Sequence, residues 1–84
     1  MAYTLEISNS AKKEIRSIPV LFQEKIRKAI RLLSDDARPD GCVKLKGFRD
    51  LYRIRIGDYR VIYAINDGNQ MITIRNVSQR GSAY

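Results

Sequence analysis

Histidine and tryptophan are absent from this 84-residue sequence, and cysteine occurs only once. Because Cys42 has no second thiol to pair with, a disulfide-stabilised scaffold is excluded. The absence of histidine excludes a histidine-based metal site and a histidine general base. No apolar run approaches the roughly 20 residues of a membrane-spanning helix, and no signal peptide is visible. We therefore expect a cytoplasmic protein with one domain over residues 1–84, no membrane contact and, without a metal-ligand spacing or a glycine-rich phosphate loop, no cofactor.

Acidic residues are scarce relative to basic ones. Nine Asp and Glu residues face 16 Lys and Arg residues, and the formal net charge is +7. Such an excess favours a polyanionic partner. The excess is concentrated in the second half, because residues 1–40 hold eight basic and six acidic residues whereas residues 41–84 hold eight basic and three acidic residues.

The first half has the apolar spacing of a short strand followed by two helices. Residues 3–7 alternate and predict a strand, and Ser8, Asn9 and Ser10 offer N-caps for a helix near residues 10–17. Pro19 ends that helix and suits the first turn of the next one. The second helix is amphipathic over about four turns. Its apolar stripe consists of Phe22, Ile26, Ala29, Ile30 and Leu33.

The second half alternates in steps of two and predicts antiparallel strands. Gly57-Asp58 separates two alternating runs, residues 51–56 and 59–65, and suits a type II′ hairpin turn that pairs Arg55 with Arg60. Asp67-Gly68 at the centre of residues 66–69 favours a type I′ turn, which would pair Arg60 with Arg75. The predicted fold is α+β, with two N-terminal helices packed on a small antiparallel sheet in the order β-α-α-β-β-β-β.

These registers place arginines on neighbouring strands of one sheet face. Arg55, Arg60 and Arg75 form a predicted row, and Arg53 lies two positions before Arg55. Like charges opposite each other destabilise a sheet by about 0.2–1 kcal/mol per pair, so a bound polyanion explains the cluster better than stability does. A solvated face of splayed side chains is the alternative explanation. Converging guanidinium groups bind phosphate with paired hydrogen bonds.

The same residues are compatible with RNA cleavage. RNA supplies its own nucleophile in the 2′-OH, so neither serine nor cysteine is required. A proton acceptor is required, and arginine is a poor one because its pKa exceeds about 12. Without histidine, the acceptors left open are Lys44, Lys46, a tyrosine or a carboxylate. Tyr84 follows Arg80 by four residues in a short basic tail.

Four segments of the chain resemble the RelE/ParE toxin superfamily, on its RelE side. The resemblance extends over nearly the whole chain, and its most specific part is Gly-Asp-Tyr-Arg-Val-Ile-Tyr. It implies a RelE-like microdomain and a toxin of a type II toxin–antitoxin pair, an endoribonuclease that cuts mRNA in the ribosomal A site by 2′-OH attack. It also implies a cognate antitoxin, with operator DNA bound only through the antitoxin complex. The segments are residues 44–47, 52–56, 57–63 and 77–80, the last followed by Tyr84.

The resemblance also implies roles for individual residues. Matched by position, Arg53, Arg55, Arg60, Arg80 and Tyr84 are catalytic, and Lys44 and Lys46 bind RNA. Arg75 is predicted to bind RNA from the register alone. The best-known RelE pattern has lysine where Arg53 and Arg55 stand, and many relatives have histidine where this chain has Gln79. The general base is therefore not identified by the sequence.

Two other functions remain open from the sequence. A ParE-like toxin would share the fold but inhibit gyrase. A catalytically degenerate toxin would be a basic binding module that keeps only its antitoxin and operator roles. Codon preference, antitoxin identity and the oligomeric state of the complex cannot be deduced from these residues.

Overall fold

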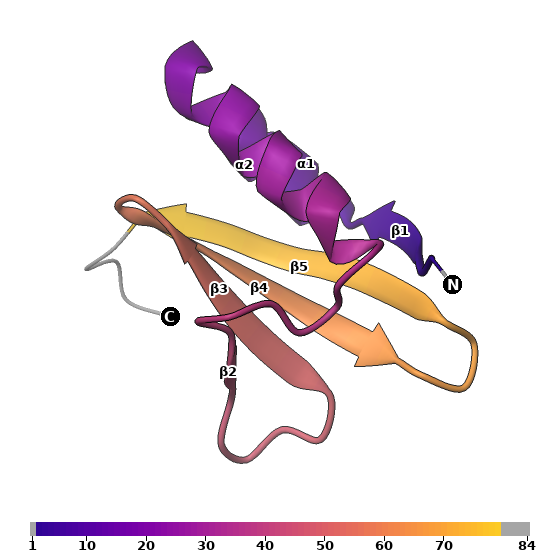
Figure 1. The fold of residues 1–84 in the computed structure, drawn as a ribbon. Helices are drawn as coiled ribbons and strands as arrows, with labels where there is room; N and C mark the ends of the chain where they lie inside the picture. The colour runs from indigo at the N-terminus through magenta and orange to yellow at the C-terminus, as the bar shows by residue number, and fades with distance from the viewer. Residues whose placement is uncertain (1, 80–84) are drawn as a thin grey trace.

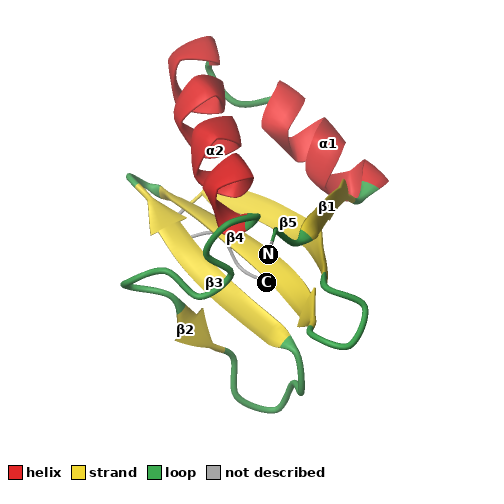
Figure 2. Ribbon diagram, turned by 45° about the vertical axis from the view of Figure 1, so that its right-hand side comes forward, coloured by secondary structure: helices red, strands yellow, loops and turns green. Residues whose placement is uncertain are grey.

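The computed structural model describes residues 2–79, which form a five-stranded sheet with two helices on one of its faces (Figures 1 and 2). The sheet order is β1-β5-β4-β3-β2. β1 runs parallel to β5 and every other pair is antiparallel, so the sheet is mostly, rather than wholly, antiparallel. The predicted α+β class and element order are confirmed. The elements are β1 (Thr4–Ile7), α1 (Asn9–Arg16), α2 (Val20–Leu33), β2 (Val43–Lys44), β3 (Leu51–Ile56), β4 (Tyr59–Asn66) and β5 (Met71–Gln79).

Local signals in the sequence set the helix boundaries. Ser8 caps α1, because its Oγ accepts a hydrogen bond from the Ala11 N–H at 3.1 Å. Pro19 stands at the N-cap of α2. Most of the predicted apolar stripe of α2 is buried, but Phe22 is 38% exposed. Figure 1 shows that the first turn of α2 projects beyond the sheet. The Phe22 ring contacts the Tyr59 ring, with centroids 5.5 Å apart, and Lys25 Nζ lies 5.8 Å from the Phe22 ring centroid.

The β3–β4 hairpin has the predicted register. Ile56 pairs with Tyr59 and Arg55 with Arg60. Gly57 has a φ of +59°, whereas Asp58 is not among the residues with positive φ. This combination fits the type II′ turn, which needs a left-handed backbone only at its first central position.

The predicted β4–β5 register is wrong. Four residues, 67–70, connect the strands in place of a two-residue turn, so Asn66 pairs with Met71. The Asn66 side chain stabilises this wider turn, because its Oδ1 accepts a hydrogen bond from the Asn69 N–H at 3.0 Å. A register irregularity between Ile62 and Tyr63 then leaves Arg75 without a partner on β4. Arg60 consequently pairs with Ser78 and not with Arg75.

The hydrophobic core lies between the helices and one face of the sheet. Ala11, Ile15, Ile26, Ile30 and Leu33 pack from the helix side, and each is at most 3% exposed. The extra residue at Arg75 changes which side chains of β5 face the core. Before it the even-numbered residues Ile72 and Ile74 face the core, and after it the odd-numbered Val77 does. The sheet contributes Ile54, Tyr59, Val61, Tyr63, Ile65, Ile72, Ile74 and Val77 to this cluster.

A polar network ties the loop after α2 to the end of the sheet. Arg38 forms an ion pair with Asp67 at 2.9 Å, and its guanidinium also lies over the Tyr52 ring at 5.0 Å. The Tyr3 hydroxyl donates a hydrogen bond to Asp67 at 2.6 Å. Arg38 is therefore a structural clamp that the sequence analysis did not single out. No helix among the described residues has the length and apolar character needed to cross a membrane.

Candidate nucleic-acid interface

Three arginines lie together on the sheet face that neither helix covers. Arg53 and Arg55 on β3 alternate with Ile54, which faces the core, so both point to the opposite side. Arg60 on β4 is the direct cross-strand partner of Arg55. Arg53 pairs with Ile62 and is therefore a diagonal neighbour of Arg60. We call Arg53, Arg55 and Arg60 the arginine face.

The arginine face combines an exposed group with two half-buried ones. Arg55 is exposed, and Arg53 and Arg60 are half-buried. Arg53 Nε is buried, and neither it nor the buried Ser78 Oγ has a hydrogen-bond partner in the described part of the chain. Among residues 2–79 neither Arg53 nor Arg55 forms an ion pair. The positive charges of Arg53 and Arg55 therefore have no carboxylate partner within residues 2–79, which suits an external phosphate.

Ser78 occupies the position in the row that the sequence assigned to Arg75. It is the β5 partner of Arg60, so the row across three strands runs Arg55, Arg60, Ser78. Arg75 is exposed at the irregularity, and its carbonyl oxygen accepts a hydrogen bond from Ser8 Oγ at 3.1 Å. The sequence did not predict this position of Ser78, because it depends on the wide turn and on the extra residue in β5. Neither feature can be recognised from the local sequence.

The two lysines predicted to bind RNA lie at the β2 edge. Lys44 pairs with Tyr52, whose ring packs toward the core, whereas the β2 partner of Arg53 is Val43. Cross-strand partners share a face, so Lys44 and Arg53 lie on opposite sides of the sheet. Lys46 is exposed in the loop between β2 and β3. Arg80 and Tyr84, the other predicted site residues, lie outside the described residues.

An apolar strip continues the arginine face toward the other end of the strands. Ile62 belongs to this face and not to the core cluster, yet it is only 7% exposed. Leu51, Ala64 and Met71 alternate with core residues in the same way and are half-buried. The open side of the sheet is therefore basic at one end and apolar at the other.

The chemistry available at this face is electrostatic. The described residues contain no group of three or more His, Cys, Asp and Glu side chains arranged to hold a metal ion. Tyr63 faces the core, where burial raises the pKa of its hydroxyl and that hydroxyl donates a hydrogen bond to the Ala37 carbonyl at 2.8 Å. It is not a base for the arginine face. The arginines can position a phosphate and stabilise negative charge that develops on it.

Comparison with known proteins identifies relatives along almost the whole chain. The family model described as the ParE toxin of the type II toxin–antitoxin system parDE matches residues 5–84. The RelE1 protein of Methanocaldococcus jannaschii is 31% identical over 87 residues, which cover 100% of this chain and 97% of that protein. The mRNA interferase toxin RelE of Escherichia coli K12 is 28% identical over 82 residues, covering 95% of this chain and 85% of that protein.

Solved structures share the fold. The archaeal RelE–RelB complex of Pyrococcus horikoshii OT3 contains a chain with a TM-score of 0.86 and 33% identity, covering 99% of this chain and 100% of that one. The intact RelBE toxin–antitoxin complex of E. coli contains a chain with a TM-score of 0.82 and 25% identity, covering 98% of this chain and 100% of that one.

Proposed function

The chain belongs to the RelE/ParE toxin superfamily and is a RelE-like toxin of a toxin–antitoxin system, and from this premise we propose that it is a ribosome-dependent endoribonuclease that cleaves mRNA in the A site. The observation that carries the proposal is the arginine face. It gathers three guanidinium groups on the sheet surface that the helices leave open. Arg55 and Arg60 are cross-strand partners with the same charge, and a bound polyanion would weaken the repulsion between them. The E. coli relative that bears the name mRNA interferase supports the reaction.

The proposed reaction uses the RNA itself as the nucleophile. The 2′-OH of one nucleotide attacks the adjacent phosphorus and the bond to the 5′-oxygen of the next nucleotide breaks, leaving a 2′,3′-cyclic phosphate and a 5′-OH. The phosphate gains negative charge on the way to the transition state. Arg60 donates its paired N–H groups to that phosphate, and Arg53 and Arg55 orient and neutralise the flanking backbone.

Proton transfer is assigned to groups other than the arginine face. An arginine stays protonated far above neutral pH, so it cannot take the proton from the 2′-OH. That proton passes to a lysine, a tyrosine, a carboxylate or water, and the departing 5′-oxygen takes up a proton from such a group or from water to become the 5′-OH. Arg80 and Tyr84 complete the proposed catalytic set, as the family resemblance implies. Lys44, Lys46 and Arg75 are proposed to contact the RNA backbone outside the arginine face.

The proposed partners are the ribosome, its mRNA and a cognate antitoxin. Relatives of known structure occur in toxin–antitoxin complexes, which supports an antitoxin for this chain. Operator DNA is proposed to be contacted only through the antitoxin complex.

Induction of the chain without any partner gene tests this function. We expect growth arrest and new transcript 5′ ends that carry a 5′-OH and fall inside translated codons. A matched transcript without its start codon should stay intact, because the proposed cleavage needs a translating ribosome. Cleavage of that control would contradict ribosome dependence.

A gyrase target is the second candidate, because the matching family model is described as the ParE toxin. It predicts DNA-damage signalling with intact transcripts in the same induction experiment. If induction causes neither transcript cleavage nor DNA-damage signalling and growth continues, the chain is a basic binding module without catalytic activity.

A further inference from the structure

The edge of β5 that faces away from β4 is covered by two different elements along its length. β1 pairs with residues 71–74 and stops there, whereas β5 continues to Gln79 (Figure 1). From Arg75 onward, side chains from the N-cap and the body of α1 reach the backbone of β5 in place of a strand. This stretch of β5 contains the extra residue that interrupts its register with β4.

Ser8, the N-cap of α1, contacts the backbone of β5 at the extra residue. Its N–H donates to the Ile74 carbonyl at 3.0 Å, and its Oγ donates to the Arg75 carbonyl at 3.1 Å. Successive carbonyls of a regular strand point to opposite sides, so two that reach the same residue mark the place where β5 departs from regular geometry. The same Oγ accepts the Ala11 N–H, so the start of α1 is fixed to the extra residue.

Glu14 makes a second contact between α1 and β5. All nine acidic residues of the chain lie within the described residues, and Glu14 alone is half-buried while the others are exposed. Its Oε1 accepts a hydrogen bond from the Val77 N–H at 2.8 Å. A hydrogen bond to a carboxylate is stronger than one to a neutral acceptor. Among residues 2–79 no Lys or Arg forms an ion pair with Glu14, so its recorded partner is a backbone amide.

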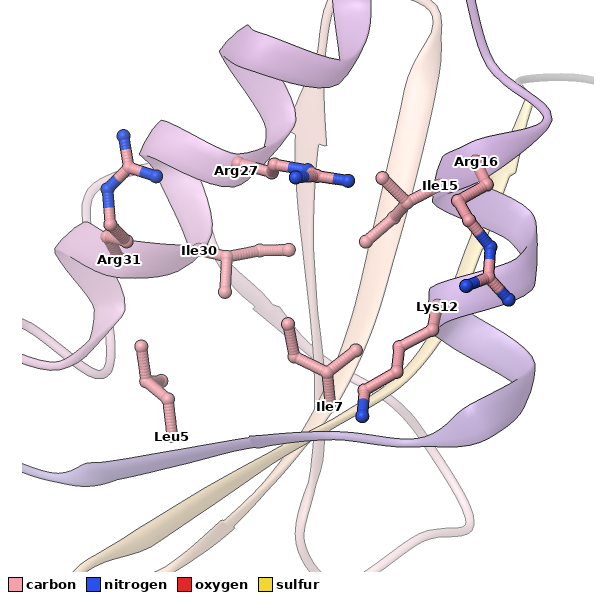
Figure 3. A pocket seen from close by; sticks show the side chains of 8 residues that line it. All are labelled: Leu5, Ile7, Lys12, Ile15, Arg16, Arg27, Ile30 and Arg31. Carbon is pink, nitrogen blue, oxygen red and sulfur yellow. The ribbon is translucent and has the colours of Figure 1, made fainter.

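The packing of α1 directs both contacts toward β5. Ala11 and Ile15 are 0% and 3% exposed, and Figure 3 shows the Ile15 side chain pointing from α1 into the space between the helices. Ser8 and Glu14 lie three residues before and after Ala11, and residues at this spacing share one side of a helix. Both therefore approach β5 from the buried side of α1.

The extra residue decides which side chain of β5 lies beside Arg60. In the structure Arg60 pairs with Ser78, and Val77 faces the core. If β5 continued regularly from the pair of Tyr63 with Ile74, Arg60 would pair with Val77 and Ser78 would turn to the core face. A branched apolar side chain would then stand beside the guanidinium that is proposed to bind phosphate.

We propose that Glu14, together with Ser8, is a positioning residue for the arginine face. The Glu14 carboxylate holds the Val77 N–H away from β4, which keeps the extra residue in β5 and Ser78 beside Arg60. Glu14 acts through the backbone of β5 and not by contact with RNA. The consequence for cleavage rests on the proposed function, whereas the effect on the strand register does not.

Amide hydrogen exchange and NOEs of the purified full chain test the effect on the register. Glu14→Ala removes the acceptor, so exchange of the Val77 amide should accelerate by about tenfold or more. The NOE between the Hα atoms of Val61 and Val77 should weaken, because these atoms lie close together only in the present register. Glu14→Gln keeps an oxygen acceptor and should restore most of the protection.

Glu24→Ala is the matched control. Glu24 is exposed on α2 and forms no ion pair among residues 2–79, and its loss changes the net charge by the same amount. Exchange of the Val77 amide and its NOE to Val61 should therefore equal those of the parent. Thermal melting checks that each variant remains folded.

Single-turnover cleavage of mRNA on translating ribosomes tests the positioning. Glu14→Ala should lower the cleavage rate at saturating toxin by about tenfold and leave the half-saturating concentration nearly unchanged, because the contacts with RNA remain while their geometry loosens. A variant that is merely less folded would need more toxin for saturation but would reach the parent rate. Glu14→Gln should recover most of the rate, and Glu24→Ala should cleave like the parent.

Two results would overturn the proposal. Unchanged Val77 exchange with an unchanged NOE in Glu14→Ala would show that the carboxylate does not hold the extra residue. A changed register with the parent cleavage rate would show that the extra residue does not position the arginine face. If the parent chain itself cleaves no mRNA, the proposed function fails, and the exchange and NOE measurements alone decide whether Glu14 keeps Ser78 beside Arg60.

Discussion

At the scale of single residues, Arg60 carries the most specific prediction. It is half-buried between Arg55 and Ser78, its cross-strand partners. If it stabilises the charge that develops on the phosphate, Arg60→Ala should slow mRNA cleavage by about 10²-fold or more. Arg60→Lys keeps the charge but loses the paired donors, so it should restore only part of the rate. Cleavage on translating ribosomes and growth after induction measure both effects.

The matched control for Arg60 is Arg49→Ala. Arg49 is exposed in the loop between β2 and β3 and carries the same charge outside the arginine face. Its loss should leave cleavage nearly unchanged. Full toxicity of a folded Arg60→Ala variant would exclude Arg60 from the reaction.

Asp67 makes stability depend on pH through a different set of contacts. The Arg38 guanidinium holds the pKa of Asp67 below its ordinary value of 3.8, with help from the Tyr3 hydroxyl. A lowered pKa stabilises the fold above the ordinary value, and this contribution is lost as the pH falls through the folded-state pKa. The Asp67→Asn variant should therefore have a lower free energy of unfolding than the parent near neutral pH. This difference in free energy should become smaller as the pH falls into the acid range.

Urea unfolding at several pH values measures that difference. The same carboxylate raises the pKa of the Tyr3 hydroxyl, so Tyr3 stabilises the fold below its ordinary pKa of 10.0 and loses this effect as the pH rises through the higher value. Asp50→Asn is the control, because the exposed Asp50 side chain makes no hydrogen bond or ion pair among residues 2–79. If the difference in free energy of unfolding between the parent and Asp67→Asn stays constant across the acid range, the Arg38–Asp67 pair does not stabilise the fold.

At the scale of elements, the two turns explain what the sequence could predict and what it could not. A two-residue turn at Gly57-Asp58 leaves one possible pairing, so the positions of Arg55 and Arg60 followed directly. The Asp67-Gly68 pair has the composition of a tight turn, but the Asn66 side chain stabilises a longer one. The resulting shift by two residues left the predicted core face correct, because side chains alternate with a period of two.

The same turn limits how much of the candidate site was predictable. Beyond the shift, the extra residue at Arg75 reverses the alternation, which brings Val77 into the core and Ser78 beside Arg60. A bulge depends on packing between distant strands and has no local sequence signal here. The sequence therefore predicted the positions of Arg55 and Arg60 from one hairpin, whereas the position of Ser78 became clear only from the tertiary structure.

Gly57 and Gly68 allow a direct comparison of the two turns. Gly57 has a φ of +59°, so Gly57→Ala should lower the free energy of unfolding by about 1–2 kcal/mol. Gly68 has no positive φ, and an added Cβ would lie 3.4 Å from Asn66 Oδ1, an ordinary contact. Gly68→Ala should change stability by less than about 0.5 kcal/mol. Equal losses in denaturant melts would mean that the β3–β4 turn does not require its left-handed residue.

At the scale of the whole molecule, the basic residues gather on both sides of the sheet. The arginine face continues into the half-buried strip of Leu51, Ala64 and Met71. On the helix side of the sheet, Lys12, Arg16, Arg27 and Arg31 surround an aliphatic groove. The arginine face, where RNA is proposed to bind, therefore holds only part of the basic residues.

The salt dependence of RNA binding tests whether the two surfaces are distinct. For a single-stranded RNA, log K falls with log salt concentration by about 0.7 for each phosphate neutralised. Arg60→Ala should therefore reduce the steepness of that line by about 0.7, measured with a short oligoribonucleotide over a range of salt concentrations. Arg27→Ala, which removes one charge from α2 on the helix side of the sheet, should leave the steepness unchanged. If both substitutions reduce it equally, RNA responds to the net charge of the whole chain, and the arginine face is not a distinct phosphate-binding surface.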